Sequence, residues 1–286
     1  MKPISKGTLI FNAGGVLVGL VLVGYFVNSI FSSETAIPCS AEYQHAYRLG
    51  LERGPGELMT APELQARLGG LDFGVADNTE ILWRDAAAKR PVLQVALRKG
   101  STRPDNARTE NGGVDFSWRP KGITEAEMVC LSYDIWLPAD FDFNRGGTLP
   151  GLYGAATEGD GEGEPVFQAP LVWKSAGNSG VAVVTRSESG KQISYVERGR
   201  VRIPRGRWVS IAQEIRLNTP GQKDGILRTW IDGSVAVDRK GLQLRREASD
   251  RFEGVKANVH YGGSDPSQAA PKDASVRISA FTVAVR

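Results

Sequence analysis

The chain has 286 residues, of which 41% are hydrophobic, which is enough for one complete core. Its formal net charge is only +3, whereas nucleic-acid-binding domains carry a strongly basic stripe, so the composition argues against a nucleic-acid partner. The 34 glycines are spread without a period, which is typical of an all-β protein with many turns.

The first predicted element is residues 8–31, which contain no charged side chain. About 20 apolar residues cross a bilayer, so we expect a transmembrane helix rather than the alternative, a cleaved signal peptide. Lys2 and Lys6 lie in the short tail 1–7 before this segment, and Glu34 is the first charge after it. The positive-inside rule then places the N-terminus in the cytoplasm. The sequence predicts a single-pass membrane protein whose main domain is exported, to the periplasm if the source is Gram-negative.

Residues 32–70 are expected to form a short helical stalk next to the membrane. His45 lies on its first predicted helix, residues 41–51, as a solvated or packed side chain. Thr60 and Glu63 have the spacing of a capping box and predict a second helix.

The two cysteines are too few for a disulfide framework and fit no zinc motif. Cys39 lies just after the apolar segment, and Cys130 lies in a predicted strand. In an oxidising compartment they are able to form one disulfide. Two free thiols, or a lipid on Cys39, are the alternatives that the sequence leaves open.

From residue 71 to residue 286 the pattern predicts strands separated by turn residues. The predicted strands are 81–83, 92–98, 114–118, 129–137, 171–174, 181–186, 192–196, 208–217, 227–231, 235–238, 252–261 and 276–285. No long helix interrupts them. This order favours an all-β fold, a two-sheet antiparallel jelly-roll sandwich.

One stretch stands out, LSYDIWLPADFDFNRGGTLPGL at residues 131–152. Its first part alternates, so that Leu131, Tyr133 and Ile135 point to one side of a strand. Residues 141–151, which follow Pro138 and are rich in glycine and proline, are expected to form an ordered loop packed on the sheet.

This stretch resembles the signature of polysaccharide lyase family 14, in which YDVYFP-DFDF leads into GGKLPGL. The resemblance continues through residues 207–208, 213–225, 230–233 and 262–265, and spans about residues 92–285. It implies a jelly roll whose concave sheet holds a sugar chain, and cleavage of uronate polysaccharides by β-elimination. That reaction needs cationic groups for the carboxylate and side chains able to move protons.

The resemblance assigns these roles to the lysine of GGKLPGL, to a Ser-x-Arg pair and to a Tyr-x-Tyr pair. In this chain Thr148 replaces the lysine, Gln168 and Pro170 replace the Ser-x-Arg pair, and Ala182 and Val184 replace the tyrosines. Because Thr, Pro, Ala and Val neither hold a carboxylate nor move a proton, the sequence predicts binding with weak or no cleavage.

Other residues are candidates for the site. Strand parity places Lys174 and Arg186 on the same surface as the replaced positions, unless both are simply solvated at strand ends. Tyrosines contribute ring faces and hydroxyls to sugar sites, and a histidine titrates near neutral pH. The candidate catalytic residues are His260 and Tyr195. The candidate substrate-binding residues are Lys174, Arg186, Thr148, Gln168, Tyr153 and Tyr261.

Two charge patterns complete the reading. Residues 186–207 are basic and suit an anionic polysaccharide or a membrane surface, or else form a solvated strand edge. Residues 158–164 alternate acidic residues with glycine, and calcium binding there is a lesser alternative in a chain for which no cofactor is otherwise expected.

The predicted function is that of a membrane-anchored, exported, lyase-like protein of the bacterial envelope that binds an acidic polysaccharide. One alternative is an active lyase with a rearranged site. The second alternative is a scaffold of the envelope that binds a protein partner.

Overall fold

The chain is described by a computed structural model that covers residues 37–43, 45–84, 90–156, 165–187, 190–196, 201–262 and 265–286. The expected cytoplasmic tail 1–7, transmembrane helix 8–31 and acidic loop 158–164 lie outside the described residues. Within the ranges above, no helix has the length and apolar character that a membrane span requires.

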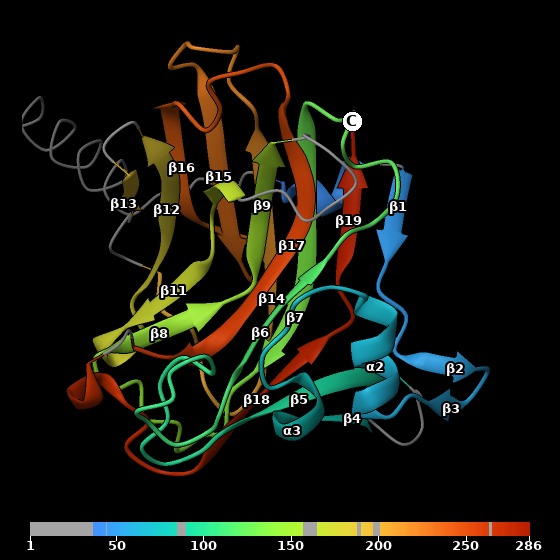
Figure 1. Cartoon of the computed structure of the whole chain (residues 1–286), viewed down its shortest axis with the longest axis vertical. Helices are drawn as coiled ribbons and strands as arrows, with labels where there is room; N and C mark the ends of the chain where they lie inside the picture. The colour runs from blue at the N-terminus through green and yellow to red at the C-terminus, as the bar shows by residue number, and fades with distance from the viewer. Residues whose placement is uncertain are drawn as a thin grey trace, which may run out of the picture. The chain divides into compact units, whose positions relative to one another are not determined.

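The first of two main sheets has nine antiparallel strands. Their order in space is β16 (Ser234–Leu242), β15 (Gly225–Ile231), β14 (Trp208–Arg216), β7 (Met128–Trp136), β18 (Ala274–Ser279), β5 (Pro91–Leu97) and β4 (Thr79–Trp83). Besides these, β19 (Thr282–Val285) pairs with β7, and β1 (His45–Arg48) pairs with β19 (Figure 1). The long strand β7 therefore occupies the middle of this sheet.

The second main sheet has eight strands. Their order is β10 (Pro165–Gln168), β9 (Gly151–Ala156), β17 (Asp250–Tyr261), β8 (Gly146–Leu149), β11 (Leu171–Lys174), β12 (Ser179–Ser187) and β13 (Gly190–Val196), and β6 (Val114–Trp118) also pairs with β17. The inward side chains of both sheets belong to one hydrophobic core. This confirms the expected all-β, two-sheet jelly-roll sandwich.

The remaining elements are short. They are the hairpin of β2 (Glu52–Gly54) and β3 (Glu57–Leu58), the helices α2 (Ala61–Leu68) and α3 (Val75–Asn78), and the 3-10 turns η1 (Cys39–Ala41), η2 (Ser175–Gly177) and η3 (Pro266–Gln268). Helix α2 confirms the predicted capping box, because the backbone N–H of Thr60 donates to Glu63 Oε2 at 2.7 Å and the Thr60 hydroxyl accepts from the Glu63 N–H.

The helix predicted at residues 41–51 is wrong, and so is the purely helical stalk built on it. His45 lies instead on β1, whose residues pair one to one with β19 from His45↔Val285 to Arg48↔Thr282. A free sheet edge offers a row of backbone hydrogen-bond groups. Pairing with that edge outweighs the weak helix preference of so short a segment.

The loop predicted at residues 141–151 is correct only up to residue 145, because β8 and β9 follow directly. A Cβ atom on Gly147 would collide with the ring of Trp173, and one on Gly151 would collide with the carbonyl oxygen of Ala169. Glycine is therefore required here for close packing inside strands rather than for turns.

Two buried side chains of the nine-stranded sheet hold the LPGL segment of the other sheet. The Tyr133 hydroxyl donates to the Pro150 carbonyl at 2.8 Å. Gln213 accepts from the Leu152 N–H at 2.8 Å and donates to the Ala169 carbonyl at 2.8 Å, and only 1% of its surface is exposed. Because buried backbone groups need partners, these side chains fasten the two sheets together.

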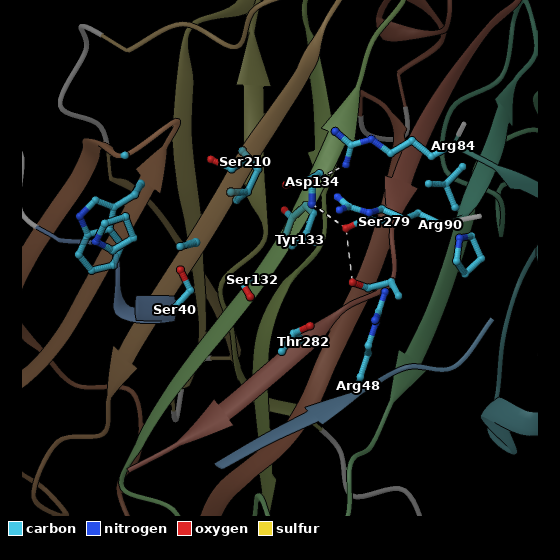
Figure 2. A pocket seen from close by; sticks show the side chains of 18 residues that line it. Ser40, Arg48, Arg84, Arg90, Ser132, Tyr133, Asp134, Ser210, Ser279 and Thr282 are labelled. Atoms are coloured by element: carbon cyan, nitrogen blue, oxygen red, sulfur yellow. Dashed lines mark hydrogen bonds and ion pairs between the residues drawn. The ribbon is translucent and has the colours of Figure 1, made fainter. Parts of the chain in front are cut away.

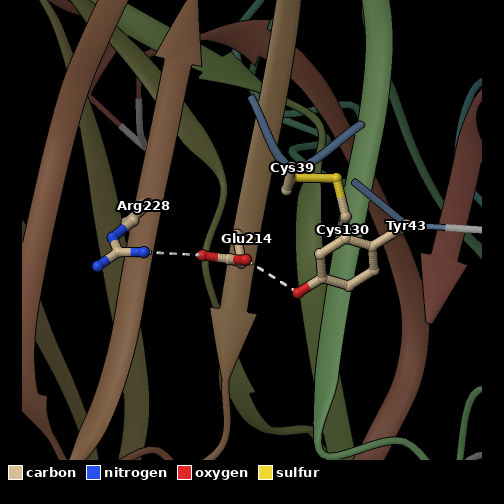
Figure 3. The surroundings of a disulfide bond; sticks show 5 residues. All are labelled: Cys39, Tyr43, Cys130, Glu214 and Arg228. Carbon is tan, nitrogen blue, oxygen red and sulfur yellow. Dashed lines mark hydrogen bonds and ion pairs between the residues drawn. A yellow bond between two sulfur atoms is a disulfide. The ribbon is translucent and has the colours of Figure 1, made fainter. Parts of the chain in front are cut away.

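A disulfide joins Cys39 to Cys130, across 91 residues of sequence, with the Cα atoms 5.8 Å apart (Figure 3). It fixes the segment around η1 on the outer face of β7. Beside it, the Tyr43 hydroxyl donates to Glu214 at 2.9 Å, and Arg228 approaches the same carboxylate at 3.5 Å. The structure thus decides between the alternatives that the sequence left open for these cysteines.

Candidate functional site

The outer face of the eight-stranded sheet carries the positions that the sequence analysis singled out. Along β11 and β12, Leu171, Trp173, Val181 and Val183 belong to the core between the sheets. Side chains alternate along a strand, so the residues between them face outward. The outward set is Val172, Lys174, Ala182, Val184 and Arg186, and Thr148 joins it because it pairs with Val172.

Three predicted residues, Thr148, Lys174 and Tyr195, line one cleft of about 260 Å³ on this face, which we call the Lys174 cleft. The Lys174 Nζ lies 5.1 Å from the centre of the Tyr195 ring, within the range of a cation–π contact. Tyr195 is 61% exposed, so its other ring face and its hydroxyl are accessible. A cation, a phenol and a small hydroxyl are thus within one cleft.

The sequence analysis missed two residues of this cleft, Arg145 and Gln268. Arg145 is exposed and donates from Nη1 to the Ser267 hydroxyl at 3.0 Å. The cleft therefore contains a second cation beside Lys174. The position of Arg145 was a usable signal, because it directly precedes the GGTLPGL motif whose threonine lines the cleft.

The hydroxyl of Thr148 is buried and finds no hydrogen-bond partner within the described residues. A buried hydroxyl without a partner costs about 1–3 kcal/mol, so a ligand oxygen at this position would remove a penalty that the free protein carries. A threonine hydroxyl does not titrate near neutral pH, so its contribution is to hydrogen bonding alone.

His260 lies next to Thr148 on the neighbouring strand but is only 5% exposed. Its Nδ1 is 3.1 Å from the carbonyl oxygen of Tyr261. Burial lowers the pKa of His260 below its ordinary value of 6.5, although the Tyr261 carbonyl and Asp115 act in the opposite direction. The imidazole is therefore neutral at pH 7 but is not among the residues that line the Lys174 cleft.

We expect the wild-type protein to lose stability relative to His260→Gln as the pH falls below 6.5, the ordinary histidine value. The unfolded chain binds the proton first because the folded pKa is lower, and the effect grows by about 1.4 kcal/mol per pH unit until the folded pKa is reached. Urea midpoints at about pH 8 and about pH 5.5 measure it. The exposed His45→Gln is the control, and equal pH dependence in all three proteins would contradict the expectation.

Gln168 and Arg186 line a different cleft, of about 230 Å³, together with Lys191. Arg186 pairs with Lys191 across β12 and β13, and Gln168 pairs with Tyr153 and Val184. This second cleft on the eight-stranded sheet also carries positive charge. The structure therefore divides the predicted binding residues between two clefts instead of gathering them into one.

The two remaining tyrosines are buried. Tyr261 has no exposed surface, its ring stacks on Phe141 with 5.6 Å between the ring centres, and its hydroxyl donates to the Asp142 carbonyl. Because it faces the core, it is not part of the candidate site. Tyr153 is 4% exposed, lies across from Gln168 and is not among the residues that line the second cleft.

Three arginines of the predicted basic stretch 186–207 hydrogen-bond within the domain, and one of them forms an ion pair. Arg202 donates to Asn178 at 3.3 Å, Arg205 to the Phe141 carbonyl at 2.7 Å, and Arg207 pairs with Asp232 at 2.5 Å. All three arginines are exposed, and Arg202 and Arg205 keep their positive charge because their partners are neutral oxygens. Within the described ranges no cluster of side chains suits a metal ion.

The same face carries one ion pair that sequence reasoning missed. Lys256 Nζ lies 2.6 Å from Asp115 Oδ1, on strands β17 and β6. Lys256, Asn258 and His260 occupy alternate positions of β17, so the alternation of the strand places them on one face.

Known proteins share this architecture. The sequence profile of polysaccharide lyase 14 matches residues 85–281. The alginate lyase of the marine animal Aplysia kurodai superposes with a TM-score of 0.62 at 23% identity, over 75% of this chain and 89% of that one. The alginate lyase of Chlorella virus superposes with a TM-score of 0.63 at 16% identity, over 79% of this chain and 97% of that one.

A third similar structure is the endo-β-1,4-glucuronan lyase of the fungus Trichoderma reesei, with a TM-score of 0.52 at 13% identity, over 73% of this chain and 87% of that one. No curated protein sequence matches the chain. At these identities the structural likeness shows a common fold and does not by itself transfer an activity.

Proposed function

The chain belongs to polysaccharide lyase family 14, and we propose that it binds an acidic polysaccharide built of uronate sugars and cleaves it weakly or not at all. The observation that carries this proposal is the joint presence of Arg145, Lys174 and Thr148 in one cleft on the outer face of the eight-stranded sheet. Alginate and glucuronan, which appear in the names of the similar lyases, are polymers of uronate sugars.

The chemistry of the Lys174 cleft suits such a ligand. A guanidinium and an ammonium bind carboxylates through charge-assisted hydrogen bonds, which are stronger than neutral ones. The Thr148 hydroxyl supplies a neutral partner for a sugar oxygen, and the exposed Tyr195 ring supplies a flat surface. The second cleft, with Arg186 and Lys191, extends the positive charge along the same sheet.

Efficient cleavage is not expected, because the side chains at the family's catalytic positions lack titratable groups. Thr148 stands where a lysine is implied, and Ala182 and Val184 stand where tyrosines are implied. β-Elimination requires a base for the proton beside the carboxylate and an acid for the leaving oxygen. None of these three side chains serves either purpose.

We expect Arg145→Ala/Lys174→Ala to weaken binding of a uronate polysaccharide at least about tenfold per residue, since a charge-assisted hydrogen bond contributes about 1.5–3 kcal/mol. Titration calorimetry with the full chain at low and high salt measures this, and salt should weaken the wild type more than the variant. The exposed pair Lys121→Ala/Arg239→Ala removes the same charge elsewhere and should bind normally. Equal binding by all three proteins would refute the proposed site.

A second candidate function is an active lyase with a rearranged site, favoured by the exposed Tyr195 beside Lys174. A phenol hydroxyl is among the groups that transfer protons in enzymes, and the Lys174 ammonium beside it would hold the uronate carboxylate. This function demands that the wild type release unsaturated sugar ends, detected by ultraviolet absorbance, and that Tyr195→Phe abolish the release. If no anionic glycan binds or is cleaved, a scaffold with a protein partner becomes the better proposal.

We further propose that residues 8–31 anchor the protein in a membrane with its main domain outside the cytoplasm, on the hydropathy and charge pattern alone. A reporter that is active only outside the cytoplasm should function when fused after Arg286. Activity of a cytoplasm-only reporter at the same position would reverse the orientation.

A further inference from the structure

A further cavity lies on the outer face of the nine-stranded sheet, away from both clefts of the proposed site. Its volume is about 570 Å³, within the range of sites that hold small ligands. Figure 2 shows its floor on β7 and β14 and its arginines along one side. We call it the arginine cavity.

Small side chains create the hollow. On the floor, Ser132 of β7 lies opposite Ala212 of β14, and Asp134 lies opposite Ser210. The next outward-facing pair along the same two strands consists of two tryptophans, Trp136 and Trp208, which lie opposite each other. The change from indole rings to serine and alanine within four residues of each strand opens a depression whose surface offers hydroxyl groups.

The charge of the cavity is unbalanced. Arg84 pairs with Asp134 at 2.5 Å, and its guanidinium lies 4.0 Å from the centre of the Trp208 ring. Arg48 and Arg90 also line the cavity, and both are exposed. Within the described ranges neither of these two arginines forms an ion pair, so three guanidinium groups face a single carboxylate.

The opposite wall is held covalently. Pro38 and Ser40 line it, and they flank Cys39, which is bonded to Cys130 of β7. Trp230 of β15 completes this side and is 2% exposed. This wall of the cavity is therefore attached covalently to β7.

We propose that the arginine cavity is a second binding site, for a short carboxylated saccharide. The guanidinium fork of arginine matches the two oxygens of a carboxylate, and the hydroxyls of Ser40, Ser132, Ser210 and Thr282 match those of a sugar. The site recognises charge rather than ring faces. Arg84 covers Trp208, Arg277 lies 5.0 Å from the Trp136 ring centre, and Trp230 is buried, so the neighbouring indoles offer little bare surface to a neutral sugar.

Calorimetric titration of the full chain with a uronate trisaccharide tests this. The wild type should show binding that Arg48→Ala/Arg90→Ala weakens about hundredfold, because each lost charge-assisted hydrogen bond costs about tenfold. Arg145→Ala/Lys174→Ala should leave binding of the trisaccharide at the cavity, the cavity component of the titration, unchanged. This result would separate the cavity from the Lys174 cleft. If the proposed function fails, the cavity component should still be present.

Two further proteins make the result decisive. Ser210→Tyr fills the cavity from an exposed position without changing its charge, and should also remove the component. Lys121→Ala/Arg239→Ala, which removes two charges elsewhere on the surface, should leave this component unchanged. Unchanged titration of both Arg48→Ala/Arg90→Ala and Ser210→Tyr, or equal binding of an uncharged trisaccharide, would overturn the proposal.

Discussion

The free energy of unfolding of Cys39→Ala/Cys130→Ala is expected to be about 4–5 kcal/mol lower than that of the wild type, because the disulfide closes a loop of 91 residues. Most of this change arises in the unfolded chain, which gains conformational freedom when the loop opens. Part of it arises in the folded chain, where the segment carrying Tyr43 loses its attachment beside Glu214.

Urea unfolding of the oxidised wild type and of the double variant measures the difference between the two midpoints. A reducing agent should move the wild-type midpoint towards that of the variant and should leave the variant unchanged. Coinciding midpoints for the oxidised wild type and the variant would show that the crosslink does not contribute to stability.

Gln213→Leu is expected to lose about 2–6 kcal/mol of stability, because it leaves two buried backbone groups without partners at about 1–3 kcal/mol each. These groups are the Leu152 N–H and the Ala169 carbonyl. The substitution nearly conserves volume, so the loss reports hydrogen bonding between the sheets more than packing.

Gln192→Leu is the matched control, since Gln192 is exposed on β13 and a surface substitution changes stability by about 0.5 kcal/mol or less. Thermal or urea unfolding of both variants gives the comparison. If the two variants are equally stable, Gln213 does not fasten the sheets.

Most strands were predictable from sequence because their side chains alternate between core and solvent. The predicted strand 114–118 coincides with β6, and 171–174 coincides with β11. The predicted strand 276–285 is two strands in the structure, because the chain passes from pairing with β5 to pairing with β1 near Ala280. Such a change of partner leaves no mark on the alternation.

Strands β8 and β9 were missed for a different reason. Gly146, Gly147 and Gly151 resemble turn residues in sequence, but all three have aromatic or backbone atoms packed against the space that a side chain would occupy. Only the tertiary contacts reveal this use of glycine. The same limit explains His45, whose strand exists because an edge of the main sheet is available to it.

The sequence predicted the face of the sheet on which the candidate residues lie, but not how these residues are divided between clefts. Parity along β11 and β12 correctly placed Lys174 and Arg186 on the outer face. It did not indicate that they line separate clefts, because that depends on the spacing between strands β8, β11, β12 and β10. Arg145 was missed because it lies outside any strand, where alternation assigns no direction.

The crosslink between Cys39 and Cys130 also determines how the domain would respond to mechanical load. A pull on the chain before Cys39 passes through the sulfur atoms to β7, the middle strand of its sheet, and bypasses the edge strand β1. The 91 residues of the loop cannot extend while the bond is intact, which withholds roughly 300 Å of contour length. A load on the chain before Cys39 would thus reach the domain at β7, which pairs with β14, β18 and β19.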